Sequence, residues 1–196
     1  KKWFVPTFKK WMSSVKPNTL VEPFFGGGII RLTCVFENLC EEVHAFELDA
    51  EVSAVWETIL GPKVGDLILE LENMEITREN ILKIHKKVEL DRRKLAFQTI
   101  VRNRTNFGGN LYDARHPKDI LRRFYRDTIV KRIRHLSSDF VQKRLKFQRG
   151  NCLELLQPYL DKEGLAFFVD PPYSYGLTEA GRRLYTHSEL DHEKLF

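Results

Sequence analysis

Short apolar runs alternate with stretches of helical periodicity in the first 60 residues. Apolar residues at 19–24 predict a short buried strand that runs into three glycines, and helical spacing follows from about Ile29 to Leu39. A second apolar run at 43–47 predicts another strand, and residues 50–60 predict another helix. A strand, a glycine turn, a helix and a strand in this order are typical of the start of a parallel α/β sheet.

The pattern changes after Gly61-Pro62, a pair that interrupts regular structure. From there to about Phe140 the apolar spacing is helical. Thr77 is the expected N-cap of one long helix that continues through Val101.

Strand character returns in the last third of the chain. Residues 145–148 predict one strand, and the nearly continuous apolar run at 165–169 predicts a central one. We therefore expect an α/β domain formed by residues 1–60 and 141–196, interrupted by a mainly helical insert of residues 61–140.

Composition restricts the class of protein. A chain of 196 residues with 42% hydrophobic residues suits a globular fold, and no apolar run approaches the roughly 20 residues of a membrane-spanning helix. Three cysteines without a CxxC pair argue against a disulfide framework or a zinc knuckle and favour a reducing, cytoplasmic compartment. Because the chain starts with Lys1-Lys2 and has neither an initiator Met nor a signal-peptide layout, we expect it to lack its natural start.

Positive charge is concentrated in the middle of the chain. Residues 78–149 carry 21 Lys or Arg against 7 Asp or Glu, whereas the remainder carries 11 against 20. This asymmetry is typical of a protein that binds a phosphate backbone, although a solvated helical face would give the same pattern. The candidate phosphate contacts are Arg102, Arg104, Arg122, Arg123 and Arg126.

Gly26-Gly27-Gly28 lies at the first strand-to-helix junction. Glycines there let a backbone approach a ligand and leave the helix N-terminus open, so the turn could hold a nucleotide-like group. No Gly-Lys-Ser/Thr follows, which excludes a P-loop, and Arg31 occupies the place of the third glycine in the dinucleotide fingerprint. A simple tight turn is the alternative.

Glu47 ends the second predicted strand about 20 residues after the glycine turn. An acidic side chain at this place accepts hydrogen bonds from a ribose diol. Asp49 is the competing candidate, with a helix N-cap as its other interpretation.

Asp170-Pro171-Pro172-Tyr173 directly follows the predicted central strand. The two prolines fix the backbone and remove two amide donors, which leaves the Asp170 carboxylate and nearby carbonyls as acceptors beside an aromatic ring. This arrangement suits a planar group with an amino donor, such as the edge of a nucleobase. A rigid turn with a satisfied aspartate is the structural alternative.

Together these motifs resemble the Dam-type adenine-specific DNA methyltransferases. The resemblance rests on the order of Val21-Glu-Pro-Phe-Phe-Gly-Gly-Gly28, Phe46-Glu-Leu-Asp49, the basic insert and Asp170-Pro-Pro-Tyr173. It extends to Arg102-Asn-Arg104 with the following glycines and to Tyr185–Leu195, so that it covers nearly the whole chain. It implies a Rossmann-like, S-adenosylmethionine-dependent methyltransferase sheet with a basic, mainly helical insert for target recognition.

The resemblance also implies a reaction: methyl transfer from S-adenosylmethionine to the exocyclic amine of adenine, with the base flipped out of duplex DNA. Asp170 and Pro171 would receive that amine, with Pro172 and Tyr173 completing the catalytic motif and Tyr173 stacking on the base. The residues that would hold the cofactor are Lys1, Phe24, Gly26, Gly28, Glu47, Asn151 and Asp170. No metal ion is required, because the sulfonium already activates the methyl group.

Departures from the family pattern keep alternatives open. Asn151 stands where related folds often carry an acid, and the chain ends at Phe196, before the strands with which the family completes its sheet. We therefore expect C-terminal strands to be missing. The alternatives are methylation of another amine (cytosine, RNA adenine or protein glutamine) and a catalytically inactive nucleic-acid-binding module. The expected partner is duplex DNA, and a cognate restriction endonuclease is a further candidate. We expect the protein to be a monomer that associates with the nucleoid and does not bind a membrane.

Overall fold

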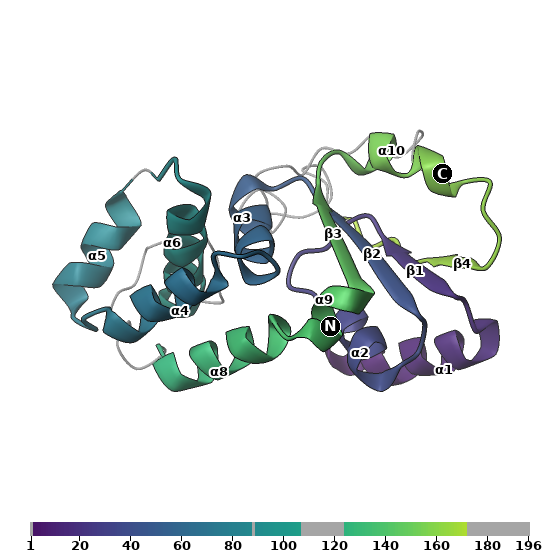
Figure 1. Ribbon diagram of the computed structural model, residues 1–196, viewed down its shortest axis with the longest axis horizontal. Coiled ribbons are helices and arrows are strands. Elements are labelled where there is room, and N and C mark those ends of the chain that lie inside the picture. Colours follow the sequence, from purple (N-terminus) through teal and green to yellow (C-terminus); the bar gives the residue numbers. More distant parts are fainter. Residues whose placement is uncertain (1, 88, 107–123, 172–196) are drawn as a thin grey trace. The chain divides into compact units, whose positions relative to one another are not determined.

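The computed structural model describes residues 2–87, 89–106 and 124–171 (Figure 1). The described residues of Lys1–Ala50 and Ser138–Pro172 form one compact unit, and those of Glu51–Ser137 form a second. We call them the sheet unit and the helical unit.

Four parallel strands form the centre of the sheet unit: β1 (Thr19–Glu22), β2 (Glu42–Glu47), β3 (Leu145–Arg149) and β4 (Leu165–Phe167). Their order across the sheet is β3-β2-β1-β4. All three neighbouring pairs are parallel, so every carboxyl end lies at the same edge of the sheet. The expectation of a parallel α/β fold is confirmed.

Helices cover both faces of this sheet (Figure 1). α2 (Ile29–Glu37) and α9 (Asp139–Arg144) contact one face, and α1 (Val5–Val15), which follows the short η1 (Lys2–Phe4), packs on α2. α10 (Cys152–Leu155) and η4 (Gln157–Tyr159) lie on the opposite face.

Side chains of β1 alternate between these two faces, as the period of a strand requires. Val21 joins a cluster with Phe46, Cys152 and Leu156 on the α10 face. Its neighbours Leu20 and Glu22, both buried, therefore point to the α2 face. The apolar run at 19–24 is thus a strand buried on both sides, which explains why it shows no hydrophobic–polar alternation.

The helical unit contains α3 (Ala50–Ile59), α4 (Val64–Asn73), α5 (Arg78–Lys86), α6 (Arg92–Thr105) and α8 (Arg126–Leu136). One apolar cluster holds these helices together. Its buried members are Ile59, Leu67, Ile68, Leu71, Met74, Ile81, Phe97, Ile100, Val101, Phe124, Ile129, Val130 and Ile133. The expected helical character of the basic middle segment is confirmed for its described residues.

The prediction of one helix from Thr77 through Val101 is wrong, although Thr77 is indeed an N-cap, with its hydroxyl accepting from the Asn80 N–H. The helix ends at Lys86, and Asp91 begins a second one by accepting a hydrogen bond from the Lys94 N–H at 2.9 Å. The Gln98 side-chain amide donates to the carbonyls of Ile84 and Lys87 at the break, which stabilises the end of the first helix.

No helix among the described residues is long and apolar enough to cross a lipid bilayer.

Candidate cofactor and catalytic site

The strand order brings the two principal sequence motifs together. β1 pairs with β2 on one side and with β4 on the other, so the direction in which the chain adds strands reverses between β1 and β4. In open α/β sheets, ligands bind beyond the carboxyl ends of the strands at such a reversal. The glycine turn follows β1 and Asp170 follows β4, so both lie at this edge.

Register confirms that the two motifs leave the sheet side by side. Val21 pairs with Phe167, and the Phe168 N–H donates to the Val21 carbonyl at 3.0 Å, one step beyond the end of β4. Phe168 also packs against Phe4 and Phe8, with ring centroids 5.8 and 5.5 Å apart. The chain leading to Asp170 is therefore anchored to β1 and to the N-terminal helical segment.

The glycine turn requires glycine for its backbone conformation. Gly26 and Gly28 have φ angles of 48° and 74°, in the left-handed region that side chains disfavour. A Cβ atom at Gly26 or Gly27 would meet nothing within 4 Å, so the outer side of the turn is open. Gly28 is also the N-cap of α2 and supplies no side chain to the first N–H groups of that helix. The turn thus offers an open backbone surface at Gly26 and Gly27, whereas Gly28 is buried.

Glu47 fastens this turn to the end of β2. Its Oε2 accepts a hydrogen bond from the Gly26 N–H at 2.8 Å, and its Oε1 accepts from the Asp49 N–H at 2.9 Å. Burial raises the pKa of Glu47, whereas these backbone hydrogen bonds oppose the shift. Glu47 is thus a half-buried hydrogen-bond acceptor at the carboxyl end of β2.

Asn151 and Asp49 lie close to helix starts. The Asn151 Oδ1 accepts from the Leu153 N–H at 3.1 Å and caps α10, a role that sequence reasoning did not assign to it. The Gly150 N–H donates to the Glu47 carbonyl at 3.0 Å, which keeps Asn151 at the same edge of the sheet as Glu47. Asp49 directly precedes α3.

Asp170 and Pro171 are the described part of the catalytic motif, and both are half-buried. Phe24, Gly26, Gly28, Glu47, Asn151, Asp170 and Pro171 therefore all lie at the carboxyl-end edge of the sheet. Five residues named from the sequence lie outside the described residues: Lys1, Arg122, Arg123, Pro172 and Tyr173.

Two of the candidate DNA-binding arginines are engaged within the helical unit. Arg102 donates from Nη1 to Glu51 Oε1 at 2.8 Å and from Nη2 to the His85 carbonyl at 2.7 Å. Arg126 donates to the Met74 carbonyl. Sequence alone could not reveal these contacts, because the acceptors lie far away along the chain.

Arg104 differs from these two arginines. It is exposed, as is Arg132 on α8, and within the ranges that the structure describes neither guanidinium is paired with a carboxylate. Burial of part of the side chain lowers the pKa of Arg104, and the positive charge of Arg132 lowers it further. Two neighbouring cations of this kind favour a shared anion.

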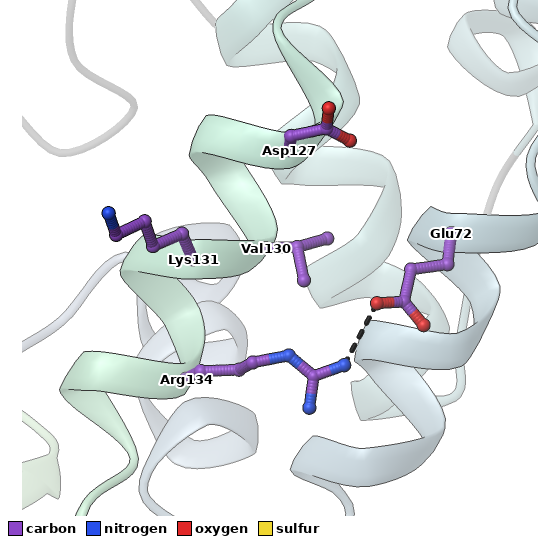
Figure 2. Close-up of a pocket in the computed structure, with 5 residues that line it drawn as sticks. All are labelled: Glu72, Asp127, Val130, Lys131 and Arg134. Carbon is purple, nitrogen blue, oxygen red and sulfur yellow. Dashed lines mark hydrogen bonds and ion pairs between the residues drawn. The ribbon is translucent and has the colours of Figure 1, made fainter.

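A pocket of about 310 Å³ lies between α4 and α8 in the helical unit (Figure 2). Its lining residues are Glu72, Asp127, Val130, Lys131 and Arg134. Arg134 and Glu72 form an ion pair at 2.8 Å, and Lys131 extends away from that pair. Because the lining carries both signs of charge, this pocket does not by itself favour a phosphate group.

Sequence reasoning missed two residues at the glycine turn. In the sequence, Arg31 stands out only as a departure from the dinucleotide fingerprint, and Glu22 only as part of a mostly apolar strand. Both are buried, and they contact each other. The signal was present, since a lone charged residue within each of two apolar segments indicates a paired burial.

Comparison with known proteins gives one family. The pattern of the D12 class N6 adenine-specific DNA methyltransferases matches residues 1–195. No curated protein matches the chain.

Proposed function

The chain belongs to the D12 class of N6 adenine-specific DNA methyltransferases, and from this premise we propose how its residues divide the reaction between cofactor binding, catalysis and DNA contact. It is an enzyme that uses S-adenosylmethionine and methylates adenine in DNA. The observation that carries the proposal is the position of the glycine turn and Asp170 beyond adjacent strands β1 and β4.

The residues at the sheet edge fit S-adenosylmethionine. A Cβ atom at Gly26 or Gly27 would meet no described atom within 4 Å, and Glu47 is a half-buried acceptor bonded to the Gly26 N–H. We assign Phe24, Gly26 and Gly28 to the walls of the cofactor site and Glu47 to the ribose hydroxyls. Asn151 retains a second lone pair on Oδ1 for the amino group of the cofactor's adenine, and Lys1 is assigned from the family resemblance alone.

S-adenosylmethionine supplies a methyl group activated by the adjacent sulfonium. The protein orients the acceptor. The Asp170 carboxylate and the Pro171 carbonyl would receive the two hydrogens of the adenine amine, which favours a more tetrahedral nitrogen and directs its lone pair at the methyl group. The N–C bond would form as the methyl–sulfur bond breaks, S-adenosylhomocysteine would leave, and the cationic methylated amine would release its extra proton to water. Holding the two reactants in line contributes up to about 7–11 kcal/mol to lowering the barrier.

Asp170 acts by orientation and not as a base. The unperturbed pKa of an aspartate is about 3.9, far too low for it to remove a proton from a neutral amine before methyl transfer. Pro172 and Tyr173 complete the motif, with the Tyr173 ring stacking on the flipped adenine.

We assign DNA contact to the helical insert, residues 61–140. Arg104 and its neighbour Arg132 are its first candidates for phosphate contacts, because their guanidinium groups have no carboxylate partner within the described ranges. Arg122 and Arg123 stay candidates from charge alone. Arg102 and Arg126 support the insert through Glu51 and the Met74 carbonyl, and reach DNA only if those contacts open.

The family resemblance supports a further set of assignments. We propose a monomer that works beside a cognate restriction endonuclease and associates with the nucleoid. Sedimentation of the purified protein tests the oligomeric state, and a dimer at micromolar concentration would contradict it.

The decisive experiment is methyl transfer from S-adenosylmethionine to unmethylated duplex DNA, with the digested nucleosides identified by mass spectrometry. We expect N6-methyladenine from the wild-type protein and a loss of at least about 100-fold in rate for Asp170→Ala, with DNA affinity retained. Asp161→Ala, at an exposed position before β4, is the matched control and should keep full activity. An Asp170→Ala variant within a few-fold of the wild type would contradict the catalytic assignment.

A further inference from the structure

Glu22 and Arg31 form a buried ion pair directly beneath the glycine turn. Glu22 is the last residue of β1 and is 1% exposed; Arg31 is the third residue of α2 and is 4% exposed. The Arg31 guanidinium donates from Nε to one carboxylate oxygen of Glu22 and from Nη2 to the other. Charges buried to this degree are rare in proteins unless they are paired.

The same guanidinium also binds the backbone of the turn. Nη2 donates to the Phe24 carbonyl at 2.9 Å, and Nη1 donates to the Phe25 carbonyl. The guanidinium carbon lies 4.3 Å from the centroid of the Phe25 ring. The planar fork of arginine therefore joins one side chain, two consecutive carbonyls and one ring, a set of contacts that lysine could not make.

These two carbonyls immediately precede Gly26, whose N–H donates to Glu47. The turn is consequently held from two sides, by a cation at its carbonyls and by an anion at its amide. The two groups interact electrostatically. Burial lowers the pKa of Arg31, and the negative charge of Glu47 opposes this shift by raising it.

We propose that Arg31 is a positioning residue for S-adenosylmethionine, acting through the Phe24 and Phe25 carbonyls to hold the Gly26–Gly28 backbone in its receptive conformation. This inference rests on the proposed assignment of the turn to the cofactor. Arg31 occupies the place where the dinucleotide fingerprint has its third glycine, a residue that permits close helix–strand packing. In this protein the Arg31 side chain occupies the space between α2 and β1 and donates hydrogen bonds to the carbonyls of the turn.

A contribution to fold stability alone is the competing explanation, and the two can be separated. Loss of Arg31 by itself leaves Glu22 buried and unpaired, which destabilises any such fold. The double variant Glu22→Leu/Arg31→Met removes both charges, and apolar replacement of a buried ion pair is often neutral for stability. That variant still lacks both donors to the turn carbonyls. Arg31→Lys keeps the positive charge beside Glu22 but loses the fork.

The experiment measures binding of S-adenosylmethionine by calorimetry, together with KM and kcat and the urea unfolding curve of each variant. We expect the double variant to unfold at a urea concentration close to that of the wild type but to bind the cofactor about tenfold more weakly. KM for the cofactor should rise by the same factor, while kcat at saturation stays within about threefold. Arg31→Lys should bind with intermediate affinity, which is the partial rescue that a positioning role requires.

Lys9→Met is the matched control, because it breaks the exposed pair between Lys9 and Glu37 at the other end of α2 and should leave cofactor affinity unchanged. A folded double variant or Arg31→Lys variant that binds S-adenosylmethionine within twofold of the wild type overturns the inference. Absence of binding by the wild-type protein itself would instead overturn the proposed function, and with it this role for Arg31.

Discussion

The carboxylate of Glu47 and the backbone N–H of Gly26 form a 2.8 Å hydrogen bond that joins the carboxyl end of β2 to the turn after β1. Glu47, which we expect to bind the cofactor ribose, therefore also holds the glycine turn in place. We therefore expect the protonation of Glu47 to affect both the stability of the fold and the binding of the cofactor.

Stability should depend on pH through Glu47. Burial raises its pKa in the folded state above the unfolded value of about 4.3, so the folded protein binds this proton more tightly. The resulting stabilisation is fully present below the unfolded pKa and is lost as pH rises through the folded pKa. We expect the free energy of unfolding of the wild type, relative to Glu47→Gln, to fall as the pH rises above the unfolded pKa in urea titrations without cofactor. Parallel pH curves for the two proteins would contradict this.

Cofactor affinity should respond to the same group in the opposite direction. A charged carboxylate accepts hydroxyl hydrogen bonds more strongly than an amide does, so Glu47→Gln should weaken S-adenosylmethionine binding by about tenfold at neutral pH. Affinity of the wild type should fall as the pH is lowered toward the pKa of Glu47, and that of Glu47→Gln should stay flat. Calorimetry across this pH range checks both.

Alanine substitutions in the glycine turn should separate conformation from ligand contact. Gly26→Ala and Gly28→Ala should each lower the free energy of unfolding by about 1–2 kcal/mol, because both φ angles are positive. Gly27→Ala lacks that strain and meets no atom within 4 Å, so its stability should stay within about 0.5 kcal/mol of the wild type. If Gly27→Ala nevertheless weakens cofactor binding, the alanine side chain occupies space that the cofactor uses. Unchanged binding would show that the cofactor binds elsewhere.

Arg102 and Arg104 should behave differently although they are two residues apart. Arg102→Ala removes two hydrogen bonds within the helical unit and should lower stability by about 1–3 kcal/mol. Arg104→Ala should leave stability unchanged but weaken DNA binding and reduce the slope of log affinity against log salt by about 1. Urea unfolding and fluorescence anisotropy at several salt concentrations measure the two effects. An unchanged salt slope for Arg104→Ala would exclude a phosphate contact there.

Asn151 combines a cap with a proposed cofactor contact. Asn151→Ala removes the acceptor for the Leu153 N–H and should cost about 1 kcal/mol of stability, whereas Asn151→Asp keeps an equally good cap. If the amide oxygen also receives the amino group of the cofactor, Asn151→Asp should keep its affinity and Asn151→Ala should lose it. Equal affinities in both variants would limit Asn151 to capping.

Sequence predicted the sheet of this protein better than its helices. The four strand regions were found because each is a short apolar run next to glycine, proline or charged residues. The break between Lys86 and Asp91 was missed because apolar spacing continues across it, and the capping role of Asp91 depends on where the preceding helix stops. Periodicity cannot locate such an end when the carbonyls there are satisfied by a distant side chain, here Gln98.

The same limit applies to the site. The residue types and the order of the motifs predict that Glu47 and Asp170 lie at the carboxyl-end edge of the sheet. They do not predict the reversal in strand order that brings β4 beside β1. Nor could charge counting distinguish Arg102, held by Glu51, from Arg104, since the difference lies in a partner on another helix.

The pairing of β1 with β4 also sets an order of events during synthesis. Thr19 pairs with Leu165, and the whole helical unit is made between them. Contacts within α3 to α8 are closer in sequence and can form while the ribosome is still translating, because local contacts form before distant ones. The edge that joins the glycine turn to Asp170 can close only after the chain has passed Phe167, so we expect the described helices α3 to α8 to form before the candidate cofactor and catalytic site.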